Sequence, residues 1–307
     1  MNDFSLDEIG SIFSRASLFK KSFLENSRFD DLIVKSHTGP NIMGLIFLEP
    51  STRTRISFQM AGRRMGIGSV RLDGSSSNSR VKGESDVDTI ETVAAMMPDF
   101  LVVRYGGDVE VQACLEGLSC PVINAGSGAA GHPTQALLDV YTILQKRGKI
   151  EDEKILFVGD VLHSRVANSN LTLLKSMGAK IGIFCPEHLL PKSQEWSGAK
   201  VFSSLSEGMK WSSVTMALRI QMERHNEGEH SMPLDHYVKQ YRVDSEAMTN
   251  LSEDGILMNP GPFVHDVELT SEVLEDPRCC VREQVTNGMF VRASLISHIN
   301  GFSIVGE

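Results

Sequence analysis

The sequence has little of what marks membrane-spanning, secreted or nucleic-acid-binding proteins. No apolar run approaches the roughly 18 residues that a spanning helix needs. The first residues, MNDFSLDEIGSIF, are acidic where a secretory leader would be basic. Positive charge is scarce too, since 30 Lys and Arg face 39 Asp and Glu, a net charge of −9. We therefore expect a cytoplasmic protein with no nucleic-acid or membrane partner, in which any bound anion meets a local cationic pocket.

Cysteine patterns that hold metals or disulfide frameworks are also missing. The five cysteines form no C-x-x-C pair. We interpret them as reduced packing or surface thiols and expect no metal site.

What the sequence does contain is enough apolar material for two globular cores. Hydrophobic residues make up 41% and charged residues 22%, close to the average for folded proteins. A chain of 307 residues is long for one core and comfortable for two. We interpret the charged stretch 146–154 (KRGKIEDEK) as the region where the chain passes between domains.

Apolar periodicity predicts alternating strands and helices. Strand patterns occupy 41–48, 99–103, 122–124, 154–158, 180–184, 215–218 and 255–258, and helical patterns occupy 50–66, 132–145 and 165–177. We expect helix 50–66 to bury Ile56, Met60 and Ala61. Strands followed by helices predict an α/β fold in which helices flank parallel sheets.

The turn that opens helix 50–66 is the first candidate for anion binding. Ser51 or Thr52 can cap the helix, and the free N–H groups of its first turn point outward. Arg53 and Arg55 add guanidinium groups, so amides, hydroxyls and cations converge as in a phosphate cradle. An ordinary capped helix with solvated arginines accounts for the same residues equally well.

Three further segments present polar side chains at a strand end or in a loop. Arg104 follows an apolar strand, where open parallel sheets bind their ligands. A loop of small residues delivers His132 and Gln135 to a helix start, and His132 can donate to an oxygen on which charge develops. Lys82 lies in a loop flanked by Ser and Gly. Taken singly, a capping histidine and a solvated loop lysine explain these residues as well.

Together, these segments resemble the aspartate and ornithine carbamoyltransferase family. The resemblance runs through STRTR at 51–55, KGE at 82–84, Arg104, HPTQALLD at 132–139, GD at 159–160, RIQMER at 219–224, PGP at 260–262 and QVTNG at 284–288. RIQMER matches the aspartate branch, whereas the His-Cys-Leu-Pro segment of the ornithine enzymes is missing. That branch also fits the chemistry, because a substrate with two carboxylates needs guanidinium forks.

The resemblance implies an α/β fold of two similar-sized domains, each a parallel sheet flanked by helices. Residues 1–133 would bind carbamoyl phosphate, together with a C-terminal helix at 284–307 that returns to this first domain. Residues 134–283 would bind aspartate. The C-terminal segment needs a surface on which to bury the apolar residues that recur in it at helical spacing, namely Val285, Met289, Ala293 and Ile296.

The activity that the resemblance implies is condensation of carbamoyl phosphate with L-aspartate, giving N-carbamoyl-L-aspartate and phosphate. This is an early step of pyrimidine synthesis, and it would need no metal or organic cofactor. By matching positions, the carbamoyl phosphate residues would be Ser51, Thr52, Arg53, Thr54, Arg104, His132 and Gln135. The aspartate residues would be Lys82, Arg165, Arg219, Gln221, Gly261 and Pro262.

Catalysis would rest on fixed cations and hydrogen-bond donors that stabilise the leaving phosphate and the oxyanion. The residues in this role would be Arg53, Thr54, Lys82, Arg104 and His132. The family assembles as a homotrimer with shared active sites, so Lys82 would act in a neighbouring subunit's site, joined by Asn78 or Ser79. Whether a regulatory chain or a dihydroorotase binds the trimer stays open.

The sequence departs from the family pattern near the expected second-substrate pocket. Asn259 stands where His is common, and Phe263–Asp266 stands where bacterial members often have Asn-Arg-Gly. These changes favour, as an alternative, a carbamoyltransferase for another amino acid or amine. A non-catalytic trimeric partner of another pyrimidine-pathway enzyme is a second alternative. A Rossmann-type dehydrogenase is a third, suggested by KILFVGD at 154–160, but that segment lacks G-x-G-x-x-G.

Overall fold

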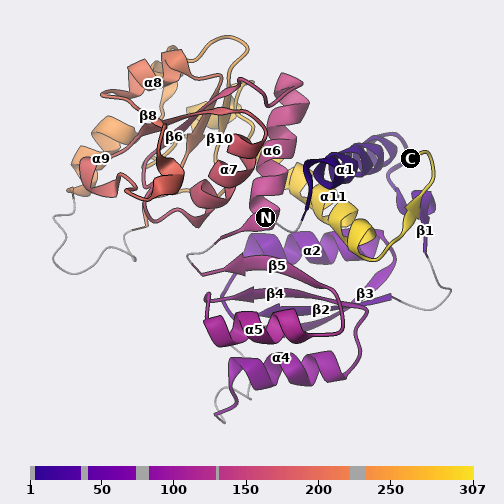
Figure 1. Cartoon of the computed structure of the whole chain (residues 1–307). Helices are drawn as coiled ribbons and strands as arrows, with labels where there is room; N and C mark the ends of the chain where they lie inside the picture. The colour runs from indigo at the N-terminus through magenta and orange to yellow at the C-terminus, as the bar shows by residue number, and fades with distance from the viewer. Residues whose placement is uncertain (1–3, 36–40, 74–82, 129–130, 222–231) are drawn as a thin grey trace. The chain divides into compact units, whose positions relative to one another are not determined.

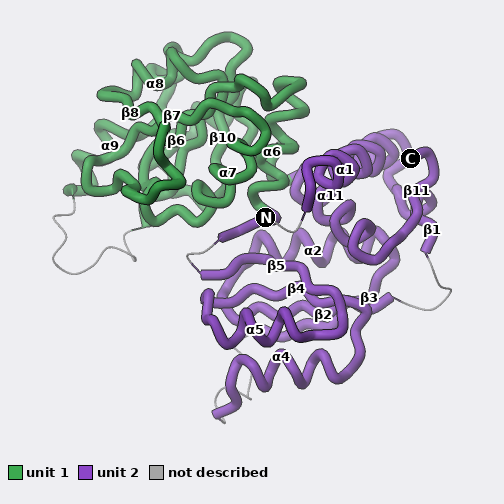
Figure 2. The backbone as a smooth tube through the Cα atoms, in the orientation of Figure 1, with its two compact units in different colours: residues 1, 135–285 green, residues 2–134, 286–307 purple. Residues whose placement is uncertain are grey.

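The chain divides into two compact units (Figure 2). The structure is a computed structural model that describes residues 4–35, 41–73, 83–128, 131–221 and 232–307. Unit 1 comprises residues 1 and 135–285, and unit 2 comprises residues 2–134 and 286–307. The chain thus passes between units at 134/135 and 285/286. In this division the charged stretch 146–154, interpreted as the passage, lies inside unit 1.

Unit 2 is built on a four-stranded parallel sheet in the order β3-β2-β4-β5. Its strands are β2 (Asn41–Phe47), β3 (Ile67–Asp73), β4 (Phe100–Tyr105) and β5 (Val122–Ser127). Its helices are α1 (Leu6–Asn26), α2 (Thr52–Arg64), α4 (Asp86–Ala95), α5 (Val109–Gly117) and most of α11 (Val281–Ile299). A short antiparallel pair joins β1 (Ile33–Val34) to β11 (Ser303–Ile304).

The two faces of this sheet are covered by different helices (Figure 1). Helices α4 and α5 pack on the face that presents Ile46, Leu101 and Val103. Helix α2 covers the other face, where Gly62 lies so close to Met43 that a Cβ atom would stand 2.9 Å from its terminal methyl group. The buried stripe of α2 consists of Thr54, Phe58, Ala61 and Gly62.

The expectation for the buried face of α2 is therefore partly wrong. Ala61 is buried, but Ile56 and Met60 are 47% and 43% exposed. The helix instead buries positions 54, 58 and 61, which follow the same 3.6-residue period with a different phase. A polar residue, Thr54, begins this stripe, so apolar periodicity alone did not reveal it.

The C-terminal helix returns to the first domain, as expected. Ser294 Oγ of α11 donates a hydrogen bond to the carbonyl oxygen of Ile12 in α1, at 2.6 Å. Lys20 Nζ donates to Asn287 Oδ1 at 2.8 Å, and the two helices lie side by side in Figure 1. Ala293 and Ile296 are fully buried, whereas Val285, expected to be buried, is 61% exposed.

Unit 1 contains a five-stranded parallel sheet in the order β10-β9-β6-β7-β8. Its strands are β6 (Lys154–Val158), β7 (Lys180–Phe184), β8 (Lys200–Val201), β9 (Val214–Ala217) and β10 (Ile256–Met258). Its helices are α6 (Pro133–Arg147), α7 (Arg165–Ser176), α8 (Leu205–Trp211), α9 (Leu234–Tyr241) and α10 (Ser245–Met248). The expected α/β class is confirmed in both units. Among the helices of the described ranges, none combines the length and the apolarity that crossing a membrane requires.

Short 3-10 helices complete the description. They are η1 (Asp30–Leu32), η2 (Glu187–Leu189), η3 (Gln194–Trp196) and η5 (Glu272–Glu275).

Candidate functional site

In each unit, the candidate residues follow the carboxyl ends of parallel strands, where α/β sheets bind ligands. In unit 2, Ser51 follows β2, Arg104 lies near the end of β4, and His132 follows β5. In unit 1, Arg165 follows β6 and Arg219 follows β9. The loop 259–262 follows β10. The topology therefore delivers both sets of candidates to the edge of a sheet that is suited to a ligand.

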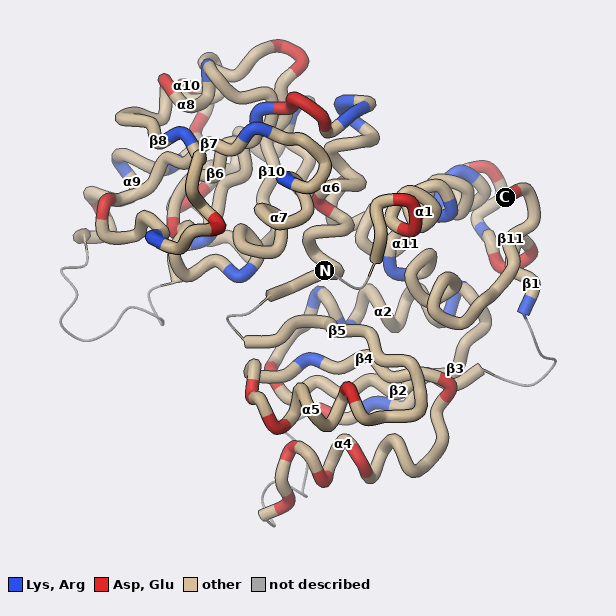
Figure 3. Tube along the Cα trace, in the orientation of Figure 1, with Lys and Arg blue, Asp and Glu red and all other residues tan. Residues whose placement is uncertain are grey.

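Three helices of unit 2, α2, α4 and α5, each carry charge of one sign only (Figure 3). Helix α2 carries four arginines and no acidic residue, whereas α4 and α5 carry acidic residues and no Lys or Arg. The arginines at the start of α2 add to the positive end of its helix dipole. A protein with a net charge of −9 thus has a local cationic site at one helix N-terminus.

The N-terminus of α2 is open. Ser51 is the N-cap residue in an extended conformation, but its side chain makes no capping hydrogen bond. Arg53 is exposed and makes no ion pair with any residue that the structure describes. Arg55, by contrast, forms an ion pair with Asp73 at 2.6 Å and so contributes to packing. Orphan N–H groups, a hydroxyl and one guanidinium are therefore available to an anion.

Arg104 is buried beside this helix start, 5% exposed. Its Nη1 donates to the carbonyl oxygen of Ala125 at 3.3 Å, and its Nε lies 3.5 Å from Glu49 Oε2. Gly126 makes room for the side chain, since a Cβ atom there would stand 2.9 Å from Arg104 Nη1. Its φ of +133° also favours glycine. The guanidinium is thus held in place before any ligand arrives.

Thr54 and His132 meet in the same unit. Thr54 Oγ1 lies 3.3 Å from His132 Nε2, and both side chains are buried. The two residues are 78 positions apart, and the parallel order of β2, β4 and β5 brings their loops together. This contact orients the imidazole at the first turn of α2.

In unit 1, two buried carboxylates hold the segment 219–221. Asp160 Oδ2 accepts from the backbone N–H of Gln221 at 3.1 Å, and Asp160 Oδ1 lies 2.9 Å from His163 Nδ1. Glu268 accepts from the backbone N–H groups of Ile220 at 3.0 Å and Val264 at 2.6 Å. Burial raises the pKa of Glu268, although these hydrogen bonds and the charge of Arg219 oppose the rise.

Sequence reasoning missed these carboxylates as parts of the site. Asp160 was quoted only as part of the GD pair, and Glu268 lies just after the divergent stretch 263–266. Both bind backbone N–H groups, which every residue except proline carries. The chain therefore gave no side-chain pattern that could have revealed them.

The loop after β10 is held by the side chain of its first residue, Asn259. Asn259, 2% exposed, accepts from the N–H of Gly261 through Oδ1 at 2.7 Å. The N–H of Asn259 donates to Gln284 Oε1 at 2.9 Å. Lys82 and its two candidate loop partners, Asn78 and Ser79, lie outside the described residues.

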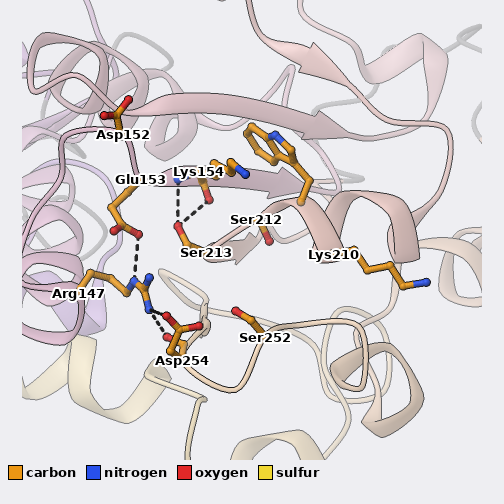
Figure 4. A pocket seen from close by; sticks show the side chains of 10 residues that line it. Arg147, Asp152, Glu153, Lys154, Lys210, Ser212, Ser213, Ser252 and Asp254 are labelled. Carbon is orange, nitrogen blue, oxygen red and sulfur yellow. Dashed lines mark hydrogen bonds and ion pairs between the residues drawn. The ribbon is translucent and has the colours of Figure 1, made fainter.

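A separate pocket of about 290 Å³ opens at the opposite, amino-terminal edge of the unit 1 sheet (Figure 4). Three of its charged side chains, Arg147, Glu153 and Asp254, pair with one another. Arg147 Nε lies 3.0 Å from Glu153 Oε2, and Arg147 Nη1 lies 2.9 Å from Asp254 Oδ2. The described residues contain no group of three or more His, Cys, Asp or Glu side chains arranged to hold a metal ion.

Comparison with known proteins agrees with this geometry. Two family models match the chain, "Aspartate/ornithine carbamoyltransferase, carbamoyl-P binding domain" over residues 1–145 and "Aspartate/ornithine carbamoyltransferase, Asp/Orn binding domain" over residues 151–299. The aspartate carbamoyltransferase catalytic subunit of Ruminiclostridium cellulolyticum is 36% identical over 307 residues, which is 100% of this chain and 96% of that protein. That of Rhizobium etli is 42% identical over 252 residues, 82% of this chain and 78% of that protein.

Solved structures show the same likeness. Aspartate transcarbamoylase from Trypanosoma cruzi in complex with carbamoyl phosphate gives a TM-score of 0.84 at 29% identity, covering 95% of this chain and 93% of that one. The same enzyme with aspartate and phosphate gives 0.81 at 29% identity, covering 96% and 93%. The chain belongs to the aspartate/ornithine carbamoyltransferase family.

Proposed function

We propose that this chain catalyses transfer of the carbamoyl group from carbamoyl phosphate to the amine of L-aspartate, giving N-carbamoyl-L-aspartate and phosphate. The observation that carries the proposal is the open N-terminus of α2 with exposed Arg53, together with buried Arg104 near the end of β4 and the Thr54–His132 contact. The named relatives support the choice of L-aspartate as acceptor. The reaction belongs to pyrimidine synthesis, and the protein acts in the cytoplasm.

The phosphate of the first substrate binds at the start of α2. Its oxygens accept hydrogen bonds from the first-turn N–H groups and from the hydroxyls and guanidinium groups around them. The side chains in this role are Ser51, Thr52, Arg53, Thr54 and Arg104. The carbamoyl oxygen lies among Thr54, Arg104 and His132, and Gln135 binds the carbamoyl amide.

The second substrate binds through the residues of unit 1. Arg165 and Arg219 supply guanidinium forks for its two carboxylates, and Gln221 and the loop 261–262 contact the rest of the molecule. The hydrogen bonds that Asp160 and Glu268 accept from backbone N–H groups support this role, because they fix the segment 219–221 that follows β9.

Transfer proceeds by addition and elimination. The unprotonated amine attacks the carbamoyl carbon, and the carbonyl oxygen gains negative charge that His132 and Arg104 stabilise. The bond from this carbon to the bridging oxygen of the phosphate then breaks, and the departing phosphate takes the proton that the amine loses. Arg53 and Arg104 stabilise that leaving group, so no metal, organic cofactor or carboxylate base takes part.

A carbamoylation assay tests the proposal. Purified protein should transfer the carbamoyl group to L-aspartate and not to ornithine or N-acetylornithine when these acceptors are offered side by side. Preference for another acceptor would support the alternative that Asn259 and the stretch 263–266 motivate. A folded protein that turns over no acceptor would support the non-catalytic alternative.

The family resemblance supports a homotrimer in which Lys82 completes the site of a neighbouring subunit. Mixing Lys82→Ala and Arg104→Ala chains after reversible dissociation should then restore some activity, because a hybrid trimer can combine an intact Lys82 with an intact Arg104. If each chain carries a whole site, hybrids verified by native mass spectrometry will stay as inactive as their parents. The same spectra of the native protein will reveal any bound regulatory chain or dihydroorotase.

A further inference from the structure

A fully buried carboxylate, Asp139, lies between a candidate contact of the first substrate and the loop of the second. Gln135 Nε2 donates to Asp139 Oδ1 at 2.9 Å, one turn earlier on α6. Gln284 Nε2 donates to the same oxygen at 2.8 Å, from a position 145 residues away at the start of α11. Asn170 Nδ2 of α7 donates to Asp139 Oδ2 at 2.8 Å.

From Gln284 the hydrogen bonds continue into the loop after β10. Gln284 Oε1 accepts from the backbone N–H of Asn259 at 2.9 Å, and Asn259 Oδ1 accepts from the N–H of Gly261 at 2.7 Å. Gln284 is 2% and Asn259 is 2% exposed, so water does not compete for these bonds. We call the series Gln135, Asp139, Gln284, Asn259 and Gly261 the amide path. All its members belong to unit 1.

The oxygens of Asp139 accept from three side-chain amides, and this fixes how the two glutamine amides are turned. Each glutamine must point its N–H2 group at Asp139, and its carbonyl oxygen then faces the other way. For Gln284, that oxygen meets the N–H of Asn259. For Gln135, Oε1 makes no hydrogen bond with any described residue. It is therefore an acceptor left over for a ligand N–H.

We propose that Asp139 is a positioning residue for carbamoyl transfer, acting through both glutamines. It holds Gln135 with its carbonyl oxygen available to the carbamoyl N–H2 group, and through Gln284 and Asn259 it fixes the backbone of the loop 259–262. One carboxylate thereby sets contacts to both substrates. The inference rests on the proposed function. Asn259, where the sequence departs from the family pattern, accepts the last hydrogen bond of the path, from the N–H of Gly261.

Three single variants test the path, with Tm and steady-state kinetics measured for each. Asp139→Leu removes the oxygen to which both glutamines donate, so neither amide is held in its orientation. We expect its kcat/KM to fall about 10- to 100-fold for both substrates. Gln284→Met removes the connection from Asp139 to the loop 259–262 and leaves the hydrogen bond between Gln135 and Asp139 in place. It should raise KM for L-aspartate about tenfold and leave KM for carbamoyl phosphate within about twofold.

Asn170→Leu is the matched control. It removes a bond of equal length to the same carboxylate, from a residue that is just as buried, but Asn170 is not part of the amide path. Its kcat/KM should stay within about threefold of wild type even if its Tm falls. A loss of activity equal to that of Gln284→Met, or losses in all variants that simply follow Tm, would overturn the proposal.

A second variant covers the case in which Gln284→Met fails to fold. Asn259→Ala removes only the last hydrogen bond of the path, and it should show the same selective rise of KM for L-aspartate. An unchanged KM in folded Asn259→Ala would contradict the proposal. If wild-type protein transfers nothing to L-aspartate, the proposed function fails; if wild type is active but the variants respond alike, only the positioning role fails.

Discussion

Helices α2 and α7 have similar sequences at their N-termini, but only one of the two N-cap serines caps its helix. Each follows a central strand of a parallel sheet, and each has serine as N-cap residue with arginine close behind. Ser164 of α7 accepts a hydrogen bond from the N–H of Ala167 at 3.1 Å and satisfies its own helix. Ser51 of α2 makes no such bond. A serine before a helix therefore does not by itself indicate either a cap or an anion site.

The difference matches the two ligands. A phosphate group is compact and doubly charged, so several backbone N–H groups of one helix turn can bind it together. The carboxylates of an amino acid stand apart, and separate guanidinium groups reach them better. Unit 2 offers an open helix start, whereas unit 1 offers Arg165 and Arg219 on a framework whose helix start is already capped.

The largest expected effect comes from removing the exposed guanidinium of α2. Arg53→Ala should lower kcat on the order of 100- to 1,000-fold, because one lost donor to developing charge costs about 3 kcal/mol. Arg55→Ala on the same helix is the control, since Arg55 is paired with Asp73 and should lose stability rather than turnover. Near-normal kcat in an Arg53→Ala protein with a native circular-dichroism spectrum would show that Arg53 is only a solvated residue.

An intermediate effect should separate the two N-cap serines. Ser164→Ala should lower the free energy of unfolding by about 1 kcal/mol and leave carbamoyl phosphate binding unchanged. Ser51→Ala should do the reverse, weakening carbamoyl phosphate binding about three- to tenfold with little loss of stability. Denaturant titration and calorimetric binding measure both quantities on each variant. Equal stability losses for the two serines would remove the distinction between the helices.

The smallest effects on activity should come from the amino-terminal edge of unit 1, where Arg147 is paired (Figure 4). Glu153 is 5% exposed and Asp254 is 73% exposed. Glu153→Gln should therefore lower the free energy of unfolding by about 2 kcal/mol, and Asp254→Asn by no more than about 0.5 kcal/mol. Neither should change kcat. A clear loss of activity in either variant would mean that this edge takes part in function.

Local pattern was enough to predict much of the fold. The strands at 154–158 and 180–184 have the predicted bounds, because continuous apolar runs flanked by charge or glycine are typical of buried parallel strands. Helix α1 was missed although its capping box, Ser5 with Glu8, is a local signal. Strand β3 was missed for a physical reason. It lies at the sheet edge, and most of its residues are exposed, so it lacks an apolar run.

For the candidate site, too, local motifs could be predicted and contacts between distant segments could not. Residues in short motifs, such as Ser51 and His132, could be chosen from the sequence. Their contacts could not, because Thr54 and His132 are 78 residues apart and Asp139 and Gln284 are 145 apart. Which loops meet depends on the order of strands in the sheet, and several different orders are compatible with one set of strand and helix patterns.

The position of Asn259 has a consequence for how the protein ages. Asparagine loses its amide chiefly when the backbone nitrogen of the following residue attacks the side-chain carbonyl. The residue after Asn259 is Pro260, whose nitrogen carries no hydrogen and cannot react in this way. The amide that closes the loop on Gly261 is thus protected from the ordinary route of deamidation. Asn259 should therefore lose its amide more slowly than an asparagine that is followed by a residue with a backbone N–H.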